Sequence, residues 1–146
     1  MENTDGAMPA MKLELVPMPV SDVDRAKAFY EKAGFKLEVD TRPTAGMRVV
    51  QFTPPGSACT IVFGTGMGKI TDMQPGSLKG LHLVVADIHE AREALIKRGL
   101  EVGKVTDFKS VKYAEFSDPD GNLWLLQEFS PELRRPGQSF YDAGDH

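Results

Sequence analysis

Few side chains of this chain could carry out acid–base chemistry from within regular structure. His82 is the only histidine in a segment that alternates like a strand, and an imidazole can donate, accept or shuttle a proton near neutral pH. The sequence places no aspartate or glutamate to orient it, so a hydrogen-bonded histidine without turnover is the competing interpretation. His82 is therefore a candidate for acid–base catalysis or for binding a polar group of a ligand.

Two other chemically capable segments do not indicate catalysis. Cys59 lies in the apolar run ACTIVF, where a small buried thiol is the usual explanation. As the single cysteine it cannot form an internal disulfide, which fits a reducing cytoplasm. The glycine-rich stretch 64–68 follows a strand, but no amphipathic helix begins at its end. It therefore does not predict a phosphate-binding loop.

Composition excludes several classes of partner. The 146 residues carry a net charge of −4, and no Lys/Arg cluster exceeds two adjacent residues, so we expect no nucleic-acid partner. No apolar run approaches the length of a membrane span, and the N-terminal segment lacks the basic and hydrophobic regions of a signal peptide. We therefore expect a globular, cytoplasmic protein without a membrane partner.

The chain contains an internal repeat. Residues 20–37 match residues 85–102 at a constant offset of 65, and residues 52–56 match residues 116–120 at an offset of 64. Two matching blocks that differ by one residue in offset indicate two copies of one module. A single copy would bury too little apolar surface for more than marginal stability. The two copies are therefore expected to share one core.

Each copy has the pattern of a strand, a helix and three further strands. In the first copy Ser21 is predicted to cap the helix and Gly34 to end it. In the second copy Asp87 is predicted to cap a helix with Glu90 in its first turn. The predicted strands are 12–20, 35–39, 47–52 and 58–63 in the first copy, and 81–85, 100–105, 113–116 and 123–129 in the second.

The predicted organisation is a single α+β domain, residues 12–129, between two terminal segments. Residues 1–11 are predicted to be flexible, and the tail 130–146 either to be mobile or to wrap a partner. Within the domain, module one covers 12–64, a linker rich in turn formers covers 65–79, and module two covers 80–129.

Two motifs accompany the repeat. D-x-x-x-A-x-x-F-Y-x-x-x-G-F begins at Asp22, and D-P-D-G-N begins at Asp118. A βαβββ module that occurs twice with these motifs resembles the vicinal oxygen chelate superfamily, which includes glyoxalase I, extradiol dioxygenases and the bleomycin-resistance proteins. The resemblance covers residues 12–129 and implies a glyoxalase-like fold of paired half-barrels around a shared cup. It implies no single activity, because the fold hosts unrelated functions.

Metal-dependent members of this superfamily place four His, Gln or Glu ligands on the first and last strands of the modules. The resemblance carries these positions to Leu15, Ile61, Gly80 and Leu125. None of the four supplies a lone-pair donor, and three are bulky and apolar. We therefore expect no metal and no cofactor.

The strand face with these positions predicts an apolar pocket with two polar groups, His82 and Gln127. Trp124 and Glu128 have the opposite parity to Leu125 and are expected to face the helices or solvent. The facing of four other residues stays open because the register of their hairpins is unknown: Arg48, Gln51, Tyr113 and Glu115. The expected ligand-binding residues are Leu15, Pro17, Ile61, Phe63, His82, Val84, Leu125 and Gln127.

Three functions compete. The first is metal-independent binding of a flat apolar or aromatic small molecule in the cup, as the resemblance to bleomycin-resistance proteins implies. The second is an enzyme that uses His82 as acid or base, such as an isomerase, epimerase or lyase of a carbonyl compound. The third is a metal-dependent glyoxalase or dioxygenase rebuilt around His82 and Glu128, which requires a register against the parity of the strand. In each case a homodimer with an isologous interface is expected.

Overall fold

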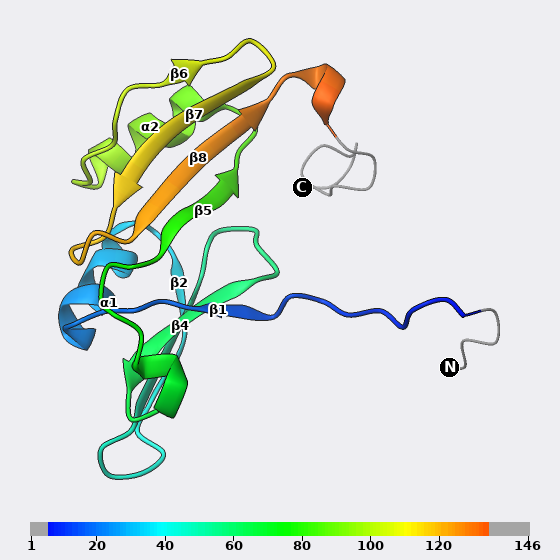
Figure 1. The fold of residues 1–146 in the computed structure, drawn as a ribbon. Helices are drawn as coiled ribbons and strands as arrows, with labels where there is room; N and C mark the ends of the chain where they lie inside the picture. Colours follow the sequence, from blue (N-terminus) through cyan, green and yellow to red (C-terminus); the bar gives the residue numbers. More distant parts are fainter. Residues whose placement is uncertain (1–5, 135–146) are drawn as a thin grey trace.

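Two four-stranded mixed sheets form the body of the chain in the computed structural model, which describes residues 6–134 (Figure 1). The predicted βαβββ order is confirmed in both halves. The first half consists of β1 (Leu15–Pro17), α1 (Val23–Lys32), β2 (Lys36–Thr41), β3 (Arg48–Thr53) and β4 (Thr60–Thr65), followed by the short helix η1 (Gly68–Thr71). The second consists of β5 (Lys79–Val84), α2 (Ile88–Lys97), β6 (Thr106–Asp107), β7 (Val111–Ser117) and β8 (Leu123–Phe129), followed by η2 (Pro131–Leu133).

The two sheets have the same topology. Sheet A has the order β1-β4-β3-β2 and sheet B the order β5-β8-β7-β6, with the first strand parallel to the last in each. One face of each sheet packs in the hydrophobic core against the helices, and we call it the helix face. The opposite face we call the open face. Side chains alternate between the two faces along a strand, and two residues paired across neighbouring strands point to the same face.

The two helices begin at matching positions of the repeat, and one of the two predicted N-caps is wrong. Asp22, not Ser21, is the N-cap of α1, and its carboxylate accepts from the Arg25 backbone N–H at 3.0 Å. The Ser21 hydroxyl instead donates to Asp120 at 2.6 Å. Asp87 caps α2 as predicted. Asp22 and Asp87 are matching positions of the repeat, so both modules begin their helices in the same way.

The predicted strand 100–105 is absent, and β6 is a two-residue strand at Thr106–Asp107. Leu100 and Val102 are buried in the core, and Gly103 donates one backbone hydrogen bond to Glu115. The apolar residues of this segment therefore reflect burial of a connection rather than sheet pairing.

One hydrophobic core joins the two modules, as predicted. Tyr30 of α1 lies at its centre, with its ring 5.8 Å from Phe63 and 6.1 Å from Phe52 on the helix face of sheet A. The same ring lies 6.0 Å from Trp124 on the helix face of sheet B. A helix of the first module thus packs against both sheets, so neither module has a complete core of its own.

The D-P-D-G-N hairpin attaches the second module to the start of α1. Asp118 accepts hydrogen bonds from Tyr30 Oη and Asn122 Nδ2, and Asn122 Nδ2 also donates to the Pro19 carbonyl at 2.8 Å. Asp120 pairs with Arg25 at 3.1 Å. Three of the motif's five residues therefore bridge the modules.

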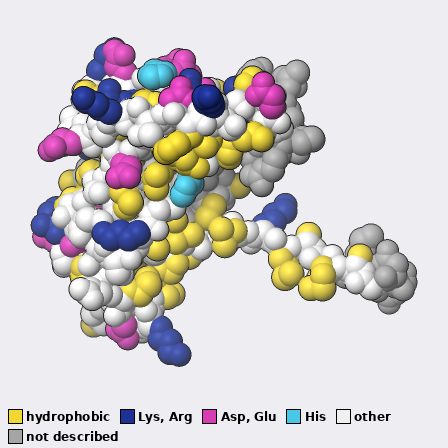
Figure 2. All heavy atoms as spheres, turned by 45° about the horizontal axis from the view of Figure 1, so that its top comes forward, with side chains coloured by type: hydrophobic (Ala, Val, Ile, Leu, Met, Phe, Trp, Pro, Cys, Tyr) yellow, Lys and Arg dark blue, Asp and Glu magenta, His cyan; other side chains and the backbone are white. Residues whose placement is uncertain are grey.

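The N-terminal arm, residues 6–13, extends away from the two sheets without regular secondary structure (Figure 1). Met8, Met11 and Leu13 expose 74%, 75% and 72% of their surface. Figure 2 shows a band of hydrophobic side chains across one face of the body and along this arm. At the other end, residues 135–146 of the predicted tail lie outside the described residues. No helix within residues 6–134 is long and apolar enough to cross a membrane.

Candidate functional site

The open face of sheet B carries a cluster of polar and aromatic side chains. The register pairs His82 with Leu125 and Leu125 with Glu115, and it pairs Gln127 with Tyr113. Cross-strand partners share a face, so all five lie on the open face. Gln127 Nε2 donates to the Tyr113 hydroxyl at 3.1 Å.

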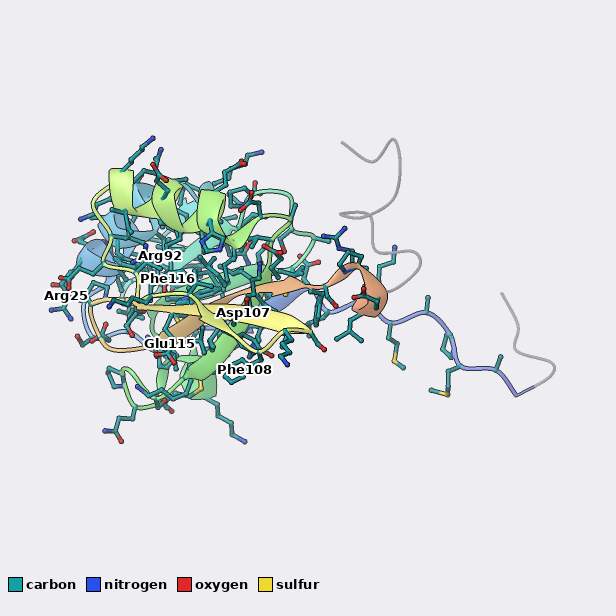
Figure 3. The ribbon with its side chains drawn as sticks, turned by 90° about the horizontal axis from the view of Figure 1, so that it is seen from above. Arg25, Arg92, Asp107, Phe108, Glu115 and Phe116 are labelled. Atoms are coloured by element: carbon teal, nitrogen blue, oxygen red, sulfur yellow. The ribbon has the colours of Figure 1, made fainter. Side chains whose placement is uncertain are left out.

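A hollow of about 390 Å³ lies on this face, and we call it the open-face hollow. Phe108 forms one side of it, with 61% of its surface exposed and its ring 6.1 Å from Tyr113. Figure 3 shows Phe108 and Glu115 on the side of the sheet away from α2, and Phe116 on the side of α2. The lining residues are Gly103, Lys104, Thr106, Phe108, Tyr113, Ala114, Glu115 and Leu125.

His82 lies on β5, the edge strand of sheet B, and its ring meets Tyr113 edge-on at 5.8 Å. Its Nδ1 lies 2.6 Å from the Gly80 carbonyl oxygen. A carbonyl can only accept, so Nδ1 carries the hydrogen, and in the neutral ring Nε2 is an acceptor. The imidazole is thus oriented by a backbone carbonyl and not by a carboxylate.

A second, larger cavity of about 730 Å³ lies between the modules, and we call it the inter-module cavity. The end of α1, the β3–β4 hairpin, β5 and α2 all contribute to it. Its lining residues are Ala33, Gly34, Phe35, Pro54, Pro55, Gly56, Ser57, His82, Leu83, Val84, Val85, Ala91, Ala94, Leu95, Arg98, Phe116 and Leu126. Because β5 is an edge strand, His82 borders this cavity as well as the open face.

The structure distributes the expected ligand-binding residues over several places. Leu125 lines the open-face hollow, and Gln127 is bonded to Tyr113 beside it. Val84 lines the inter-module cavity. Leu15 and Pro17 lie on the open face of sheet A, paired with Thr60 and Val62 of β4, and line neither cavity.

The expected facing of Ile61 and Phe63 is wrong. Both are buried on the helix face of sheet A, in the core around Tyr30. In module one, Phe52 pairs with Ile61 across a turn of eight residues, 53–60. In module two, Phe116 pairs with Trp124 across seven residues, 117–123. The extra residue changes the parity of β4, so that Ile61, not Thr60, is the counterpart of Trp124, and Val62, not Ile61, is the counterpart of Leu125.

The register also settles the facings that the sequence left open. Gln51 lies on the open face of sheet A, because its partner is Val62. Arg48 is buried on the helix face, where it forms hydrogen bonds to Asp40 and Asp24. The pKa of Asp40 is held well below its usual range, first by the hydrogen bonds from Arg48 and then by that from Lys27.

As predicted, Trp124 and Glu128 face away from the open-face hollow. Trp124 is buried in the core. Glu128 Oε1 accepts from the Ile88 backbone N–H at 2.8 Å, at the first turn of α2. A carboxylate there satisfies a free N–H and the positive end of the helix dipole. If Glu128 bound a metal ion, it would lose this hydrogen bond to the first turn of α2.

The chemistry of the donors does not fit the metal of the vicinal oxygen chelate proteins. With the corrected register, the four inherited positions hold Leu15, Val62, Gly80 and Leu125. None offers a nitrogen, sulfur or oxygen side-chain donor. Within residues 6–134 no group of three or more His, Cys, Asp or Glu side chains could hold a metal ion. Cys59 is also an unsuitable nucleophile, because burial raises the pKa of its thiol.

Sequence reasoning missed several residues of the open-face hollow, among them Lys104, Thr106 and Phe108. They lie in a segment that was predicted to be partly strand and partly loop. A usable signal was present, since Phe108 is a large aromatic residue between Asp107 and Lys109 in a polar run. Charged neighbours on both sides favour an exposed ring over a core position, and an exposed ring is available to a ligand.

Comparisons with known proteins give one family. The sequence profile of the Glyoxalase/Bleomycin resistance protein/Dioxygenase superfamily matches residues 12–126. Among solved structures, the chain is similar to TnmS3, an antibiotic binding protein from Streptomyces sp. CB03234, with 35% identity and a TM-score of 0.72 over 85% of this chain and all of that one. It is also similar to a glyoxalase/bleomycin resistance protein from the same organism, with 34% identity and a TM-score of 0.65 over 82% of this chain and all of that one.

A member of the same superfamily from Sphaerobacter thermophilus DSM 20745 is 30% identical, with a TM-score of 0.69 over 82% of this chain and 98% of that one. A search of curated proteins found no match. The profile match covers most of the chain and agrees with the twofold βαβββ fold. The chain therefore belongs to the glyoxalase/bleomycin resistance protein/dioxygenase superfamily.

Proposed function

We propose that this protein binds a planar, largely apolar small molecule in the open-face hollow, without a metal. The observation that carries the proposal is the aromatic group of Phe108, Tyr113 and His82 next to the Gln127 amide. Exposed aromatic rings offer stacking surface to a flat ligand, and a few polar atoms then fix its orientation.

The polar atoms around Tyr113 define the edge of the ligand. Because the Tyr113 hydroxyl accepts from Gln127 Nε2, its own hydrogen is left to donate. His82 Nε2 and Gln127 Oε1, which lie beside the hollow next to Tyr113, are the acceptors that we propose for the ligand. The matching molecule has a flat apolar body and one edge with both a donor and an acceptor, such as a hydroxyl group.

The similarity to TnmS3, described as an antibiotic binding protein, supports binding as the function of this chain too. The enzyme hypothesis gains no comparable support. His82 is oriented by the Gly80 carbonyl, which cannot stabilise an imidazolium as a carboxylate does. We therefore prefer binding to turnover.

The proposal includes a homodimer. The N-terminal arm exposes Met8, Met11 and Leu13. Several large apolar side chains exposed on one segment indicate a surface that another protein surface covers. The arm extends away from the sheets of its own chain, which favours a second copy as that surface (Figure 1). A single cysteine is compatible with the cytoplasm as the compartment.

The experiment is a comparison of two flat probes by calorimetry, 2-naphthol and naphthalene, which differ by one hydroxyl group. We expect 2-naphthol to bind more tightly, and Leu125→Glu to weaken it, because the substitution replaces the apolar side chain at the centre of the site by a second carboxylate opposite Glu115. Mass spectrometry of molecules released from the freshly purified protein then searches for the natural ligand. Equal affinity for both probes, unaffected by Leu125→Glu, would contradict the proposed site.

A further inference from the structure

The two modules are related by the repeat, yet the spaces beside their helices differ. α1 and α2 occupy matching positions, each over the helix face of its own sheet. Beside α1 the space between the modules is filled with side chains. Beside α2 it is the inter-module cavity of about 730 Å³.

Two aromatic residues fill the space on the α1 side. The Phe29 ring lies 5.0 Å from Tyr30 and 6.5 Å from Phe116 of the other module. The Tyr30 ring packs against Trp124, and its hydroxyl is bonded to Asp118 of the hairpin. These contacts hold the β7–β8 hairpin of the second module against α1.

The repeat replaces these residues by smaller or apolar ones on the α2 side. At the offset of 65, Phe29 and Tyr30 correspond to Ala94 and Leu95, and both of these line the cavity. At the offset of 64, Asp118 corresponds to Pro54 of the β3–β4 hairpin, which has no side-chain acceptor. Two missing rings and a missing anchor account for the cavity.

We propose that the inter-module cavity is a second binding site, distinct from the open-face hollow, for an uncharged flat aromatic molecule. Its volume is in the range of small-molecule pockets, about 300–1,000 Å³. Its walls are formed mainly by Leu, Val, Ala, Pro and Phe side chains. A ligand of this kind replaces the aromatic rings that the repeat lacks here, against the same wall residue, Phe116.

The polar groups at the cavity favour an uncharged occupant. Arg98 is the one charged residue among those that line it, and its Nε and Nη2 donate to the carbonyls of Lys32 and Glu31 at the end of α1. A cationic ligand would lose its hydration with no acidic side chain in the lining, and an anionic one would find only the exposed Arg98 guanidinium, two donors of which are already bonded.

Pyrene is a suitable probe, because it is flat, uncharged and free of polar atoms, and its emission bands report the polarity around it. Ala94→Phe places in α2 the ring that α1 has at Phe29, and should fill the cavity. We expect it to weaken pyrene binding by about tenfold or more, since the added ring and the probe compete for one space. Ser57→Phe approaches from the opposite wall and should act in the same direction if Ala94→Phe impairs folding.

Two controls make the test specific. Glu93→Phe adds the same ring one position away, at an exposed position outside the cavity lining, and should leave pyrene affinity unchanged. Leu125→Glu blocks the open-face hollow and should also leave it unchanged. The proposal is overturned if pyrene does not bind, if its affinity survives both cavity-filling variants, or if Leu125→Glu abolishes it. It is overturned too if Ala94→Phe converts a dimer to a monomer in light scattering, because the cavity would then be an interface between copies.

Discussion

The hydroxyl of Tyr30 connects Trp124 and Asp118 in the core. Trp124 Nε1 donates to it at 3.0 Å, and it donates to Asp118 Oδ2 at 2.9 Å. Burial, and then the charge of Asp118, raise the pKa of Tyr30 far above its usual value. The phenol is therefore a neutral donor near neutral pH. One atom thus links the helix of module one to the hairpin and last strand of module two.

Removing that atom should weaken the contact between the modules. Tyr30→Phe leaves the Trp124 N–H without its acceptor and Asp118 without one of its donors. We expect a loss of about 1–3 kcal/mol in the free energy of unfolding, the usual cost of unsatisfied buried polar groups. Urea denaturation measures it. Tyr113→Phe, the same change on the open face, is the control and should cost much less. Equal losses in the two variants would show that the buried hydroxyl has no special role.

The ion pairs of Asp40 should make stability depend on acid pH. Arg48 and Lys27 donate to Asp40 and hold its pKa below the usual value. Because the folded-state pKa is lowered, this stabilisation is fully present above the unfolded value of about 4 and is lost as pH falls through the folded value. Asp40→Asn should therefore flatten the acid limb of unfolding free energy against pH. Glu93→Gln, at an exposed pair with Lys97, is the control. An unchanged acid limb in Asp40→Asn would contradict this origin.

The repeat made most of the fold predictable, because both copies preserve the features that direct it. Asp22 and Asp87 begin the helices, and Gly34 and Gly99 follow them with φ of 88° and 96°, a backbone conformation that favours glycine. The D-P-D-G-N motif likewise marks the turn before the last strand. These signals are local and survive low identity between the copies.

The faces of the strands were less predictable, because they depend on the length of one hairpin. Leu125 lies on the open face as expected, because its position was counted from Gly121 in the turn that leads into the same strand. Ile61 was placed by transferring that spacing to module one, where the turn has one more residue. A single residue reverses parity, so the error moved Ile61 and Phe63 to the wrong face together. The inter-module cavity depends on packing between the modules, and only the comparison of Ala94 with Phe29 hints at it.

The open-face hollow should lose affinity when its apolar floor becomes charged. Leu125→Glu is expected to weaken 2-naphthol binding strongly, because a second carboxylate opposite Glu115 would replace the apolar side chain against which the ring packs. Leu125→Met keeps an apolar side chain of similar volume and should bind nearly as the unmodified protein does. Calorimetry on the two variants separates charge from shape. Normal binding by Leu125→Glu would place the ligand elsewhere.

The N-terminal arm should contribute to dimerisation. Deleting residues 1–13 removes Met8, Met11 and Leu13, which expose apolar surface in the single chain. If a second copy covers them, the deletion should weaken association by about tenfold or more, because their burial is lost. Sedimentation equilibrium measures this. The triple substitution of these residues by serine keeps the length of the arm and should act alike. A chain that remains equally dimeric without the arm would show that its apolar residues are not part of the interface.

His82 supplies the last test, because its ring and its nitrogen can be separated. His82→Phe keeps an aromatic ring that can meet Tyr113 edge-on, but removes Nε2 as an acceptor. We expect it to weaken 2-naphthol binding by about 1–3 kcal/mol, through the loss of the hydrogen bond from the hydroxyl group, and to leave naphthalene binding unchanged. His82→Ala should weaken both probes, because the ring is lost as well. Neither variant should lower the melting temperature by many degrees, since the side chain is exposed. A large thermal loss with normal binding would show that the histidine is structural, held by Gly80 to stabilise the edge of β5.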